Sequence, residues 1–169
     1  MNRNIEIKTR IRDLDRMKAL VEPIADSECQ VLIQEDIFFH CKNGRLKLRV
    51  FDDGRGESIY YERPDAEGPK QSNYIISHIP EPDTLRQALT LALGILGIVR
   101  KTRLLYMIGQ TRIHLDTVEG LGTFLELEVV LRPDQTEEDG RAIADGLANR
   151  LGIEEDDLIS GAYVDLPAA

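Results

Sequence analysis

Polar and apolar residues alternate along several short segments of the chain. Near its start, N-I-E-I-K-T-R-I-R (residues 4–12) places Ile5, Ile7 and Ile11 on one face of an extended strand and mostly charged side chains on the other. Residues 45–51 repeat the pattern, with basic and apolar side chains in strict alternation. Such segments predict β-strands that have one apolar face and one polar face.

The same pattern predicts most of a sheet. Further strands are expected at residues 31–40, 58–63, 72–79, 98–107, 111–118 and 123–131. Asn43-Gly44 is expected to supply the positive φ angles of a tight hairpin turn between two of them. Most connections are too short for parallel crossovers, which favours antiparallel pairing.

Helical periodicity occupies the remaining segments. Asp13 can cap a short helix, and an apolar stripe predicts a long helix over residues 80–97 that ends at Gly97. Thr136 with Asp139 resembles a capping box that opens a third helix, ending near residue 152. We therefore expect the fold class α+β, with a large antiparallel sheet or barrel and helices outside.

Composition narrows the class of protein. The chain has 169 residues, 42% hydrophobic and 30% charged, so we expect one soluble domain over residues 1–169. Its formal net charge of -9 disfavours indiscriminate binding to nucleic acid or anionic membrane. The most apolar stretch, residues 85–99, is too short to span a bilayer, and we see no signal peptide. Cys29 and Cys41 flank one strand, roughly 40 Å apart, so we expect reduced thiols and a cytoplasmic location.

The polar strand faces are rich in basic side chains although the chain is acidic. They carry eight basic and four acidic residues: Lys8, Arg10, Arg45, Lys47, Arg49, Lys101, Arg103 and Arg112 against Glu6, Asp116, Glu126 and Glu128. Such faces are typical of a half-solvated antiparallel sheet. If they converge instead, they form an electropositive site for phosphates with carboxylates for a divalent cation. The pattern alone leaves both interpretations open.

A set of motifs resembles one family. The segments occur in the order that this family uses: N-I-E-I-K (4–8), Q-E-D-I-F-F (34–39), L-K-L-R (46–49), I-Y-Y-E-R-P (59–64), K-T-R (101–103) and H-L-D-T-V-E-G-L-G-T-F-L-E-L-E (114–128). Together they resemble the CYTH, or triphosphate tunnel, superfamily. In overall pattern the chain is most similar to the class IV adenylyl cyclase-like proteins.

The resemblance implies a closed tunnel of eight antiparallel strands, helices outside, and triphosphate binding with Mg²⁺ or Mn²⁺. It assigns phosphate binding to Lys8, Arg10, Lys47, Arg49, Arg63, Lys101, Arg103 and Arg112. It assigns the metal to Glu6, Asp116, Glu126 and Glu128. Catalytic roles fall to Glu6, Lys101 and Arg103.

Three functions are compatible with this resemblance. A cyclase would convert ATP to cyclic AMP and pyrophosphate, a triphosphatase would hydrolyse inorganic or organic triphosphates, and a non-catalytic protein would bind a polyphosphate or nucleotide. The partners that we expect are ATP or another triphosphate, with a homodimer as a further option. Neither a membrane nor a specific nucleic acid is expected.

The sequence departs from the family pattern at two positions. Asn4 stands where the signature has its first glutamate, which removes one negative charge from the metal site. Relatives present a lysine near Glu62, whereas here the basic residue is Arg63. Because neighbouring strand residues face opposite sides, Arg63 replaces that lysine only if the strand bulges or ends there. Both departures bear on catalytic competence rather than on the fold.

Other side chains have a structural and a functional interpretation. His114 is either a general base or a residue of the tunnel wall. Phe38, Tyr60 and Tyr61 either pack or stack on a base, and packing is favoured. Lys70 either closes over a phosphate or lies in solvent, and solvent exposure is favoured.

Overall fold

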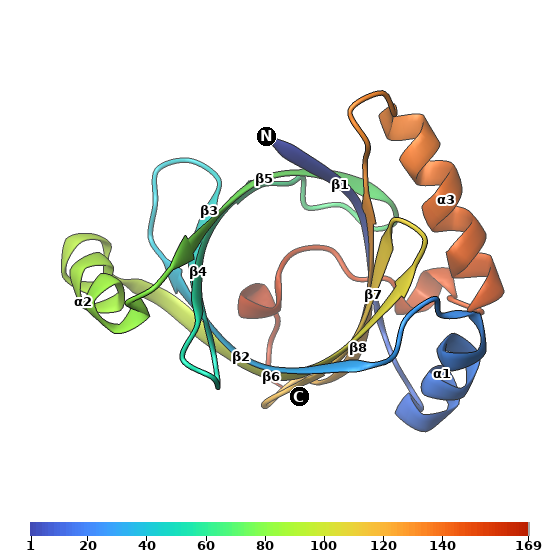
Figure 1. The fold of residues 1–169 in the computed structure, drawn as a ribbon, viewed down its shortest axis with the longest axis horizontal. Helices are drawn as coiled ribbons and strands as arrows, with labels where there is room; N and C mark the ends of the chain where they lie inside the picture. Colours follow the sequence, from blue (N-terminus) through green and yellow to red (C-terminus); the bar gives the residue numbers. More distant parts are fainter. Residues whose placement is uncertain (169) are drawn as a thin grey trace.

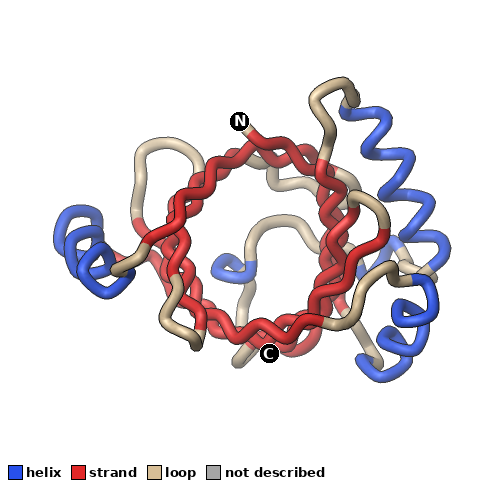
Figure 2. Tube along the Cα trace, viewed as in Figure 1, coloured by secondary structure: helices blue, strands red, loops and turns tan. Residues whose placement is uncertain are grey.

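The computed structural model describes residues 1–168 as a barrel of eight strands with helices outside (Figures 1 and 2). The strands are β1 (Asn2–Arg10), β2 (Gln30–Phe39), β3 (Arg45–Phe51), β4 (Gly56–Glu62), β5 (Lys70–Ile79), β6 (Ile95–Ile108), β7 (Thr111–Val118) and β8 (Gly122–Val130). The helices are α1 (Leu14–Val21), α2 (Pro82–Leu93) and α3 (Glu137–Arg150), with 3₁₀ turns at Glu22–Ile24, Glu155–Asp157 and Tyr163–Asp165.

The sheet closes on itself in the order β1-β5-β4-β3-β2-β6-β7-β8. Every neighbouring pair is antiparallel, and β1 closes the barrel by pairing with both β5 and β8. This confirms the α+β class and the closed antiparallel tunnel. Closure leaves no sheet edge unpaired, which removes the usual template for association between edge strands.

Alternation along each strand divides the side chains between the tunnel and the outer core. On β1, Ile5 and Ile7 face outward and are buried, whereas Asn4, Glu6 and Lys8 line the tunnel. Helices α1 and α3 cover the outside of β1, β7 and β8, and α2 lies beside β2 and β3 (Figure 1). The main apolar core therefore lies outside the barrel, between the strands and the helices, and the charged side chains line the tunnel together with a smaller apolar cluster that includes Phe38, Val99 and Tyr163.

Two of the three predicted helix starts are confirmed by their caps. Asp13 Oδ1 accepts a hydrogen bond from the Arg16 amide at the start of α1. Thr136 and Asp139 form the reciprocal capping box of α3. These local signals are reliable because each satisfies backbone N–H groups that the helix itself leaves free.

The predicted helix over residues 80–97 is too long. Helix α2 ends at Leu93, and β6 begins at Ile95. Gly94 separates them with a φ of 78°, in the region that favours glycine. Gly97 instead lies in β6 against Val164, where a Cβ atom has no room. The apolar residues after Gly94 thus belong to a strand.

The predicted hairpin is confirmed by the antiparallel pairing of β2 with β3, but its turn is longer than the tight Asn43-Gly44 turn that we expected. Residues 40–44 connect β2 to β3, and Gly44 has a φ of 59°. Within residues 1–168 no residue other than glycine has a positive φ, so Asn43 does not share in a type I′ turn.

The two cysteines lie in the loops at the two ends of β2. Cys29 and Cys41 are both exposed and free. The part of the chain that the structure describes has no helix long and apolar enough to cross a membrane.

Candidate functional site

The tunnel holds a cavity of about 230 Å³ lined by side chains from all eight strands. Its lining includes seven basic side chains, Lys8, Lys47, Arg49, Arg63, Lys101, Arg103 and Arg112. It also includes five acidic ones, Glu6, Asp36, Glu57, Glu126 and Glu128. Most of the predicted polar faces therefore converge, although Arg10, Arg45 and Asp116 are not part of the lining, and basic groups are in excess inside a chain whose net charge is -9.

One side of the tunnel is built around a single carboxylate. We call Asp36, Lys47, Arg49 and Lys101 the Asp36 wall. Asp36 Oδ2 accepts hydrogen bonds from Lys47 Nζ at 3.0 Å and Lys101 Nζ at 2.9 Å. Arg49 donates to both carboxylate oxygens, at 2.8 Å and 2.9 Å. The four residues come from the adjacent strands β2, β3 and β6, which pair side by side.

The ionisation of the Asp36 wall follows from this crowding. Burial opposes the charge on Asp36, but Arg49, Lys101 and Lys47 outweigh it and hold its pKa well below the usual range. Burial, together with nearby cations such as Arg49 and Arg103, lowers the pKa of Lys101 to about 7. The single negative charge of Asp36 is thus shared among three cations, and it fully neutralises none of them.

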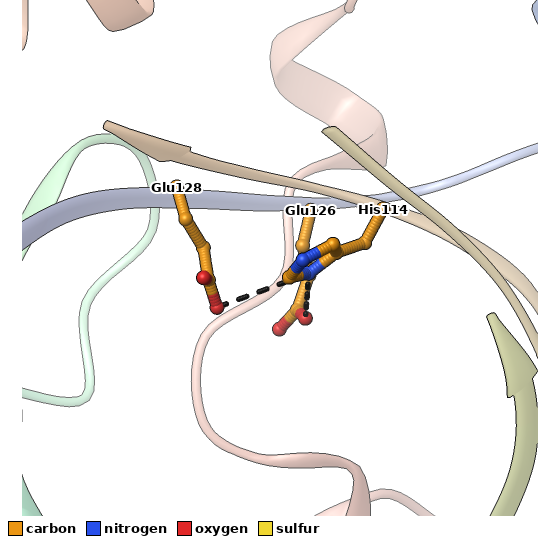
Figure 3. A group of neighbouring side chains, drawn as sticks. All are labelled: His114, Glu126 and Glu128. Atoms are coloured by element: carbon orange, nitrogen blue, oxygen red, sulfur yellow. Dashed lines mark ion pairs between the residues drawn. The ribbon is translucent and has the colours of Figure 1, made fainter. Parts of the chain in front are cut away.

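The opposite side of the tunnel gathers acidic groups. We call Glu6, His114, Glu126 and Glu128 the carboxylate wall; Figure 3 shows three of them pointing toward one another. His114 Nδ1 lies 3.5 Å from Glu126 Oε2 and 3.8 Å from Glu128 Oε1. Glu6 lies opposite Glu128 in the β1–β8 register. These side chains come from β1, β7 and β8, the strands that α1 and α3 support from outside.

Electrostatics in the carboxylate wall favours a bound cation. Burial and the charges of Glu128 and Glu126 raise the pKa of Glu6, although Arg63 partly offsets them. Burial and the nearby Arg103 lower the pKa of His114, which keeps its imidazole neutral with a lone pair available as a ligand. Around Glu126 and Glu128 the neighbouring basic and imidazole side chains outweigh burial and lower the pKa of both carboxylates, so both are ionised and available to a cation, which would also relieve the repulsion at Glu6.

The donor set fits a divalent metal ion. One ligand atom from each of His114, Glu126 and Glu128 lies within 4.8 Å of the others. Carboxylate oxygens suit Mg²⁺ and Mn²⁺, and the imidazole adds a nitrogen donor. Asn4 is 3% exposed, and within residues 1–168 its Oδ1 accepts no hydrogen bond. An unpartnered buried oxygen in the tunnel lining, two residues from Glu6, is a further donor available to a cation.

Asp116, a predicted metal ligand, has a different environment. It accepts two hydrogen bonds from Arg103, both at 2.7 Å, and a third from the Tyr163 hydroxyl at 2.7 Å. It is fully buried, and although burial raises its pKa, the charge and hydrogen bonds of Arg103 outweigh this effect and lower it. The structure therefore places Asp116 behind Arg103, and its part as a metal ligand stays a prediction.

Arg63 can replace the lysine of the family pattern, because the strand ends just before it. Strand β4 ends at Glu62, so Arg63 is free to turn into the tunnel. Its guanidinium donates to Glu6 at 2.8 Å and to the Gly161 carbonyl at 2.9 Å. It thus supplies a cation to the carboxylate wall.

The remaining predicted phosphate ligands divide into two groups. Lys8 lies 3.2 Å from Glu126, and Arg112 lies 3.2 Å from Glu128, so both reach the tunnel beside the carboxylate wall. Arg10 does not. It is exposed and lies over the Phe124 ring, 5.2 Å from its centroid, outside the cavity lining.

One end of the tunnel is crossed by the C-terminal segment, residues 158–166 (Figure 1). Tyr163 enters the tunnel, where Lys8 Nζ lies 4.0 Å from its ring centroid. The Gly161 carbonyl accepts hydrogen bonds from Lys8 and Arg63. Lys70, expected in solvent, is 1% exposed and donates to the carbonyls of Ala66 and Ile159. It therefore holds the segment in place, and its expected exposure is wrong.

Two residues of the site escaped the sequence analysis. Asp36 lies within the quoted Q-E-D-I-F-F motif, but Gln34, Glu35 and Asp36 are all polar, so no alternation marks which of them faces the tunnel. Tyr163 gave no signal either, because the C-terminal segment has no periodicity that predicts a position inside the barrel.

These features define a class: a closed antiparallel tunnel whose lining combines clustered cations with a carboxylate group for a metal ion. The sequence model of the CYTH domain family matches residues 2–163, so the chain belongs to the CYTH family.

Individual relatives agree with this assignment. A candidate adenylate cyclase of Methanocaldococcus jannaschii is 25% identical over 170 residues, which cover 96% of this chain and 97% of that protein. The structure of a Pyrococcus horikoshii protein, 25% identical, superposes with a TM-score of 0.86 over 96% of this chain and 98% of its own. A Hippeastrum protein, 17% identical, superposes with a TM-score of 0.68 over 96% of this chain and 92% of its own, and shares the fold.

Proposed function

We propose that the protein binds ATP together with Mg²⁺ or Mn²⁺ in its tunnel and converts it to cyclic AMP and pyrophosphate. The observation that carries the proposal is the division of the lining between a wall of cations and a wall of carboxylates in one cavity. A triphosphate complexed to a divalent cation is an ion with matching parts, since its phosphate oxygens are acceptors and its metal needs further oxygen ligands.

An apolar rim supports an organic triphosphate. Leu32, Phe51, Ile76 and Leu105 line the cavity toward the end that lies away from the C-terminal segment. A base or other ring can rest against these side chains while the phosphates reach the charged interior.

Each group of residues would have a distinct role in the reaction. Glu126 and Glu128, with His114, would hold the metal ion, which supplies charge neutralisation and lowers the pKa of the attacking hydroxyl. Arg103 would stabilise the charge that develops on the departing pyrophosphate as the ribose 3′-oxygen attacks the α-phosphorus, and Lys101 would add its positive charge from within the Asp36 wall. Arg63 would orient Glu6 through the hydrogen bond between them.

Hydrolysis is the second candidate. The Hippeastrum protein of the same fold is described as a candidate adenylyl cyclase that has a dominant triphosphatase activity. In this alternative, water attacks a terminal phosphorus within the same tunnel, and the same cations receive the charge. The difference between the two reactions lies in which phosphorus meets the nucleophile.

The test is to identify products. Purified protein is incubated with ATP or tripolyphosphate and with Mg²⁺ or Mn²⁺, and the products are separated by ion-exchange chromatography. Cyclic AMP with pyrophosphate supports the cyclase, orthophosphate supports the triphosphatase, and tight binding without turnover supports a binder. Glu35→Gln, which changes a carboxylate that pairs with Arg86 and Arg100, is the control outside the cavity lining.

A further inference from the structure

Asp36 is the most heavily hydrogen-bonded carboxylate of the tunnel lining, yet it has very little contact with the cavity. Its side chain is 1% exposed, and Lys101 beside it is 2% exposed. Lys47 and Arg49, which bind the same carboxylate, are 15% and 12% exposed and face the open space. Asp36 and Lys101 are thus fixed parts of the wall, whereas Lys47 and Arg49 are the groups that a ligand can reach.

Both accessible cations keep donors free. Arg49 has five N–H donors and uses two on Asp36, and Lys47 has three and uses one. Within residues 1–168 neither side chain donates to a further acceptor. Asp36 therefore fixes where the two head groups lie and leaves hydrogen-bonding capacity for a ligand.

The charge of the Asp36 wall matches one particular part of a triphosphate. Three cations and one carboxylate leave two positive charges when Lys101 is protonated. A terminal phosphate group carries close to two negative charges near neutral pH, whereas an internal phosphate carries one. The cation site of the carboxylate wall lies on the other strands, so the two walls can hold different phosphates of one ligand.

We propose that Asp36 is a positioning residue that holds Lys47 and Arg49 to receive the terminal phosphate group of the ligand. This inference rests on the proposed binding of a triphosphate in the tunnel. It assigns an orientation, with the terminal phosphate against β2, β3 and β6 and the inner phosphates toward β1, β7 and β8. It also explains why an acidic side chain, Asp36, lies in a site that binds anions.

A pair of variants separates positioning from charge. Lys101→Met leaves a wall with one net positive charge, and Lys101→Met combined with Asp36→Asn raises that charge to two. Charge alone predicts tighter binding of an anion by the double variant, whereas positioning predicts weaker binding. With inorganic tripolyphosphate and EDTA in a titration calorimeter, we expect the double variant to bind at least about tenfold more weakly than Lys101→Met. Equal or tighter binding by the double variant overturns the proposal.

A second ligand reports on the terminal group itself. Cyclic trimetaphosphate has three phosphates and no terminal one. We expect wild-type protein to prefer tripolyphosphate, and the preference to shrink in the double variant but to persist in Lys101→Met. Should both ligands weaken in parallel, Asp36 is merely structural and the assignment is wrong.

Two further variants keep the test decisive if the double variant does not fold. Lys47→Met changes a partly exposed side chain and should lower tripolyphosphate affinity several-fold more than trimetaphosphate affinity; equal losses overturn the proposal. Glu35→Gln is the matched control, since Glu35 is the next residue on β2 and pairs with two arginines on the outer face. It should bind tripolyphosphate within about twofold of wild type, and a larger loss shows that the effect is not specific to Asp36.

Failure of this inference is distinguishable from failure of the proposed function. If wild-type protein binds neither tripolyphosphate nor ATP, with or without Mn²⁺, both the proposed function and the role of Asp36 are wrong. If wild-type protein binds these ligands and the double variant binds tripolyphosphate as tightly as Lys101→Met does, only the role of Asp36 is wrong.

Discussion

The two walls of the tunnel contain buried carboxylates that behave in opposite ways. In the Asp36 wall one acid is surrounded by three cations, and its pKa lies well below the usual range. In the carboxylate wall Glu6 has one arginine partner and two glutamate neighbours, and its pKa is raised. Both acids occupy inward-facing positions of their strands. Alternation thus decides that a side chain enters the tunnel, and the neighbours on adjacent strands decide its chemistry.

This asymmetry is what a metal–triphosphate complex requires. A tunnel lined only by cations would hold phosphate but leave the metal ion without protein ligands. A tunnel lined only by carboxylates would repel the phosphates. Changes to each wall should therefore have separable effects.

The largest effect is expected for the stability of the Asp36 wall. Asp36→Asn leaves buried cations without their counterion, which should lower the free energy of unfolding by about 3–5 kcal/mol. Glu35→Gln breaks pairs with partly exposed arginines and should cost no more than about 1 kcal/mol. Urea denaturation of both variants measures the difference. Similar losses would mean that burial of the ion pairs does not distinguish the two sites.

Glu126→Gln should act on the metal ion. Glu126 offers an oxygen to the candidate metal group, and its charge is held by Lys8, His114 and Arg103. Loss of a residue that only hydrogen-bonds to a metal ligand lowers metal affinity about 10- to 100-fold. Loss of a direct ligand should therefore weaken Mn²⁺ binding by more than about 100-fold. Titration calorimetry with Mn²⁺ measures this. Glu137→Gln on the outer surface of α3 is the control, and unchanged affinity in Glu126→Gln would remove it from the ligand set.

Lys101 should make stability depend on pH. Its pKa is about 7 in the folded protein and about 10.4 in an unfolded chain. Because the unfolded state binds more protons between these values, the free energy of unfolding should rise with pH, by up to about 1.4 kcal/mol per unit. Lys101→Met removes this contribution. The stability difference between wild type and Lys101→Met should therefore increase in favour of wild type from pH 7 to pH 9, and parallel profiles would contradict a lowered pKa.

Asn4→Glu should produce the smallest effect. It places one more negative charge two residues from Glu6, and a net gain of about 1.4 kcal/mol would tighten Mn²⁺ binding about tenfold. Asn4→Gln matches the added length without the charge and should not tighten binding. If the two variants bind Mn²⁺ alike, Asn4 does not contact the metal ion.

Much of the barrel could be predicted from local pattern. Alternation on β1 and β3 gave the inward residues Lys8, Lys47 and Arg49, and capping residues gave the starts of α1 and α3. Closure of the sheet came from the resemblance, because pairing between the first and last strands leaves no local signal.

Long-range geometry could not be predicted. Asp36 is one polar residue among many until β3 and β6 bring three cations to it. Gly97 resembles the end of a helix until Val164, far away in sequence, is seen packed against it. In both cases the deciding neighbour comes from a segment that the local pattern does not connect.

The position of β1 has a consequence for how the protein folds during its synthesis. β1 is synthesised before both of its partners, β5 and β8, and β8 ends at Val130. Until β8 is available, one side of β1 remains an open strand edge with Ile5 and Ile7 uncovered. Contacts between such distant segments fold slowly and expose intermediates to aggregation. Until β8 has been synthesised, the nascent chain is therefore exposed to aggregation through this open edge.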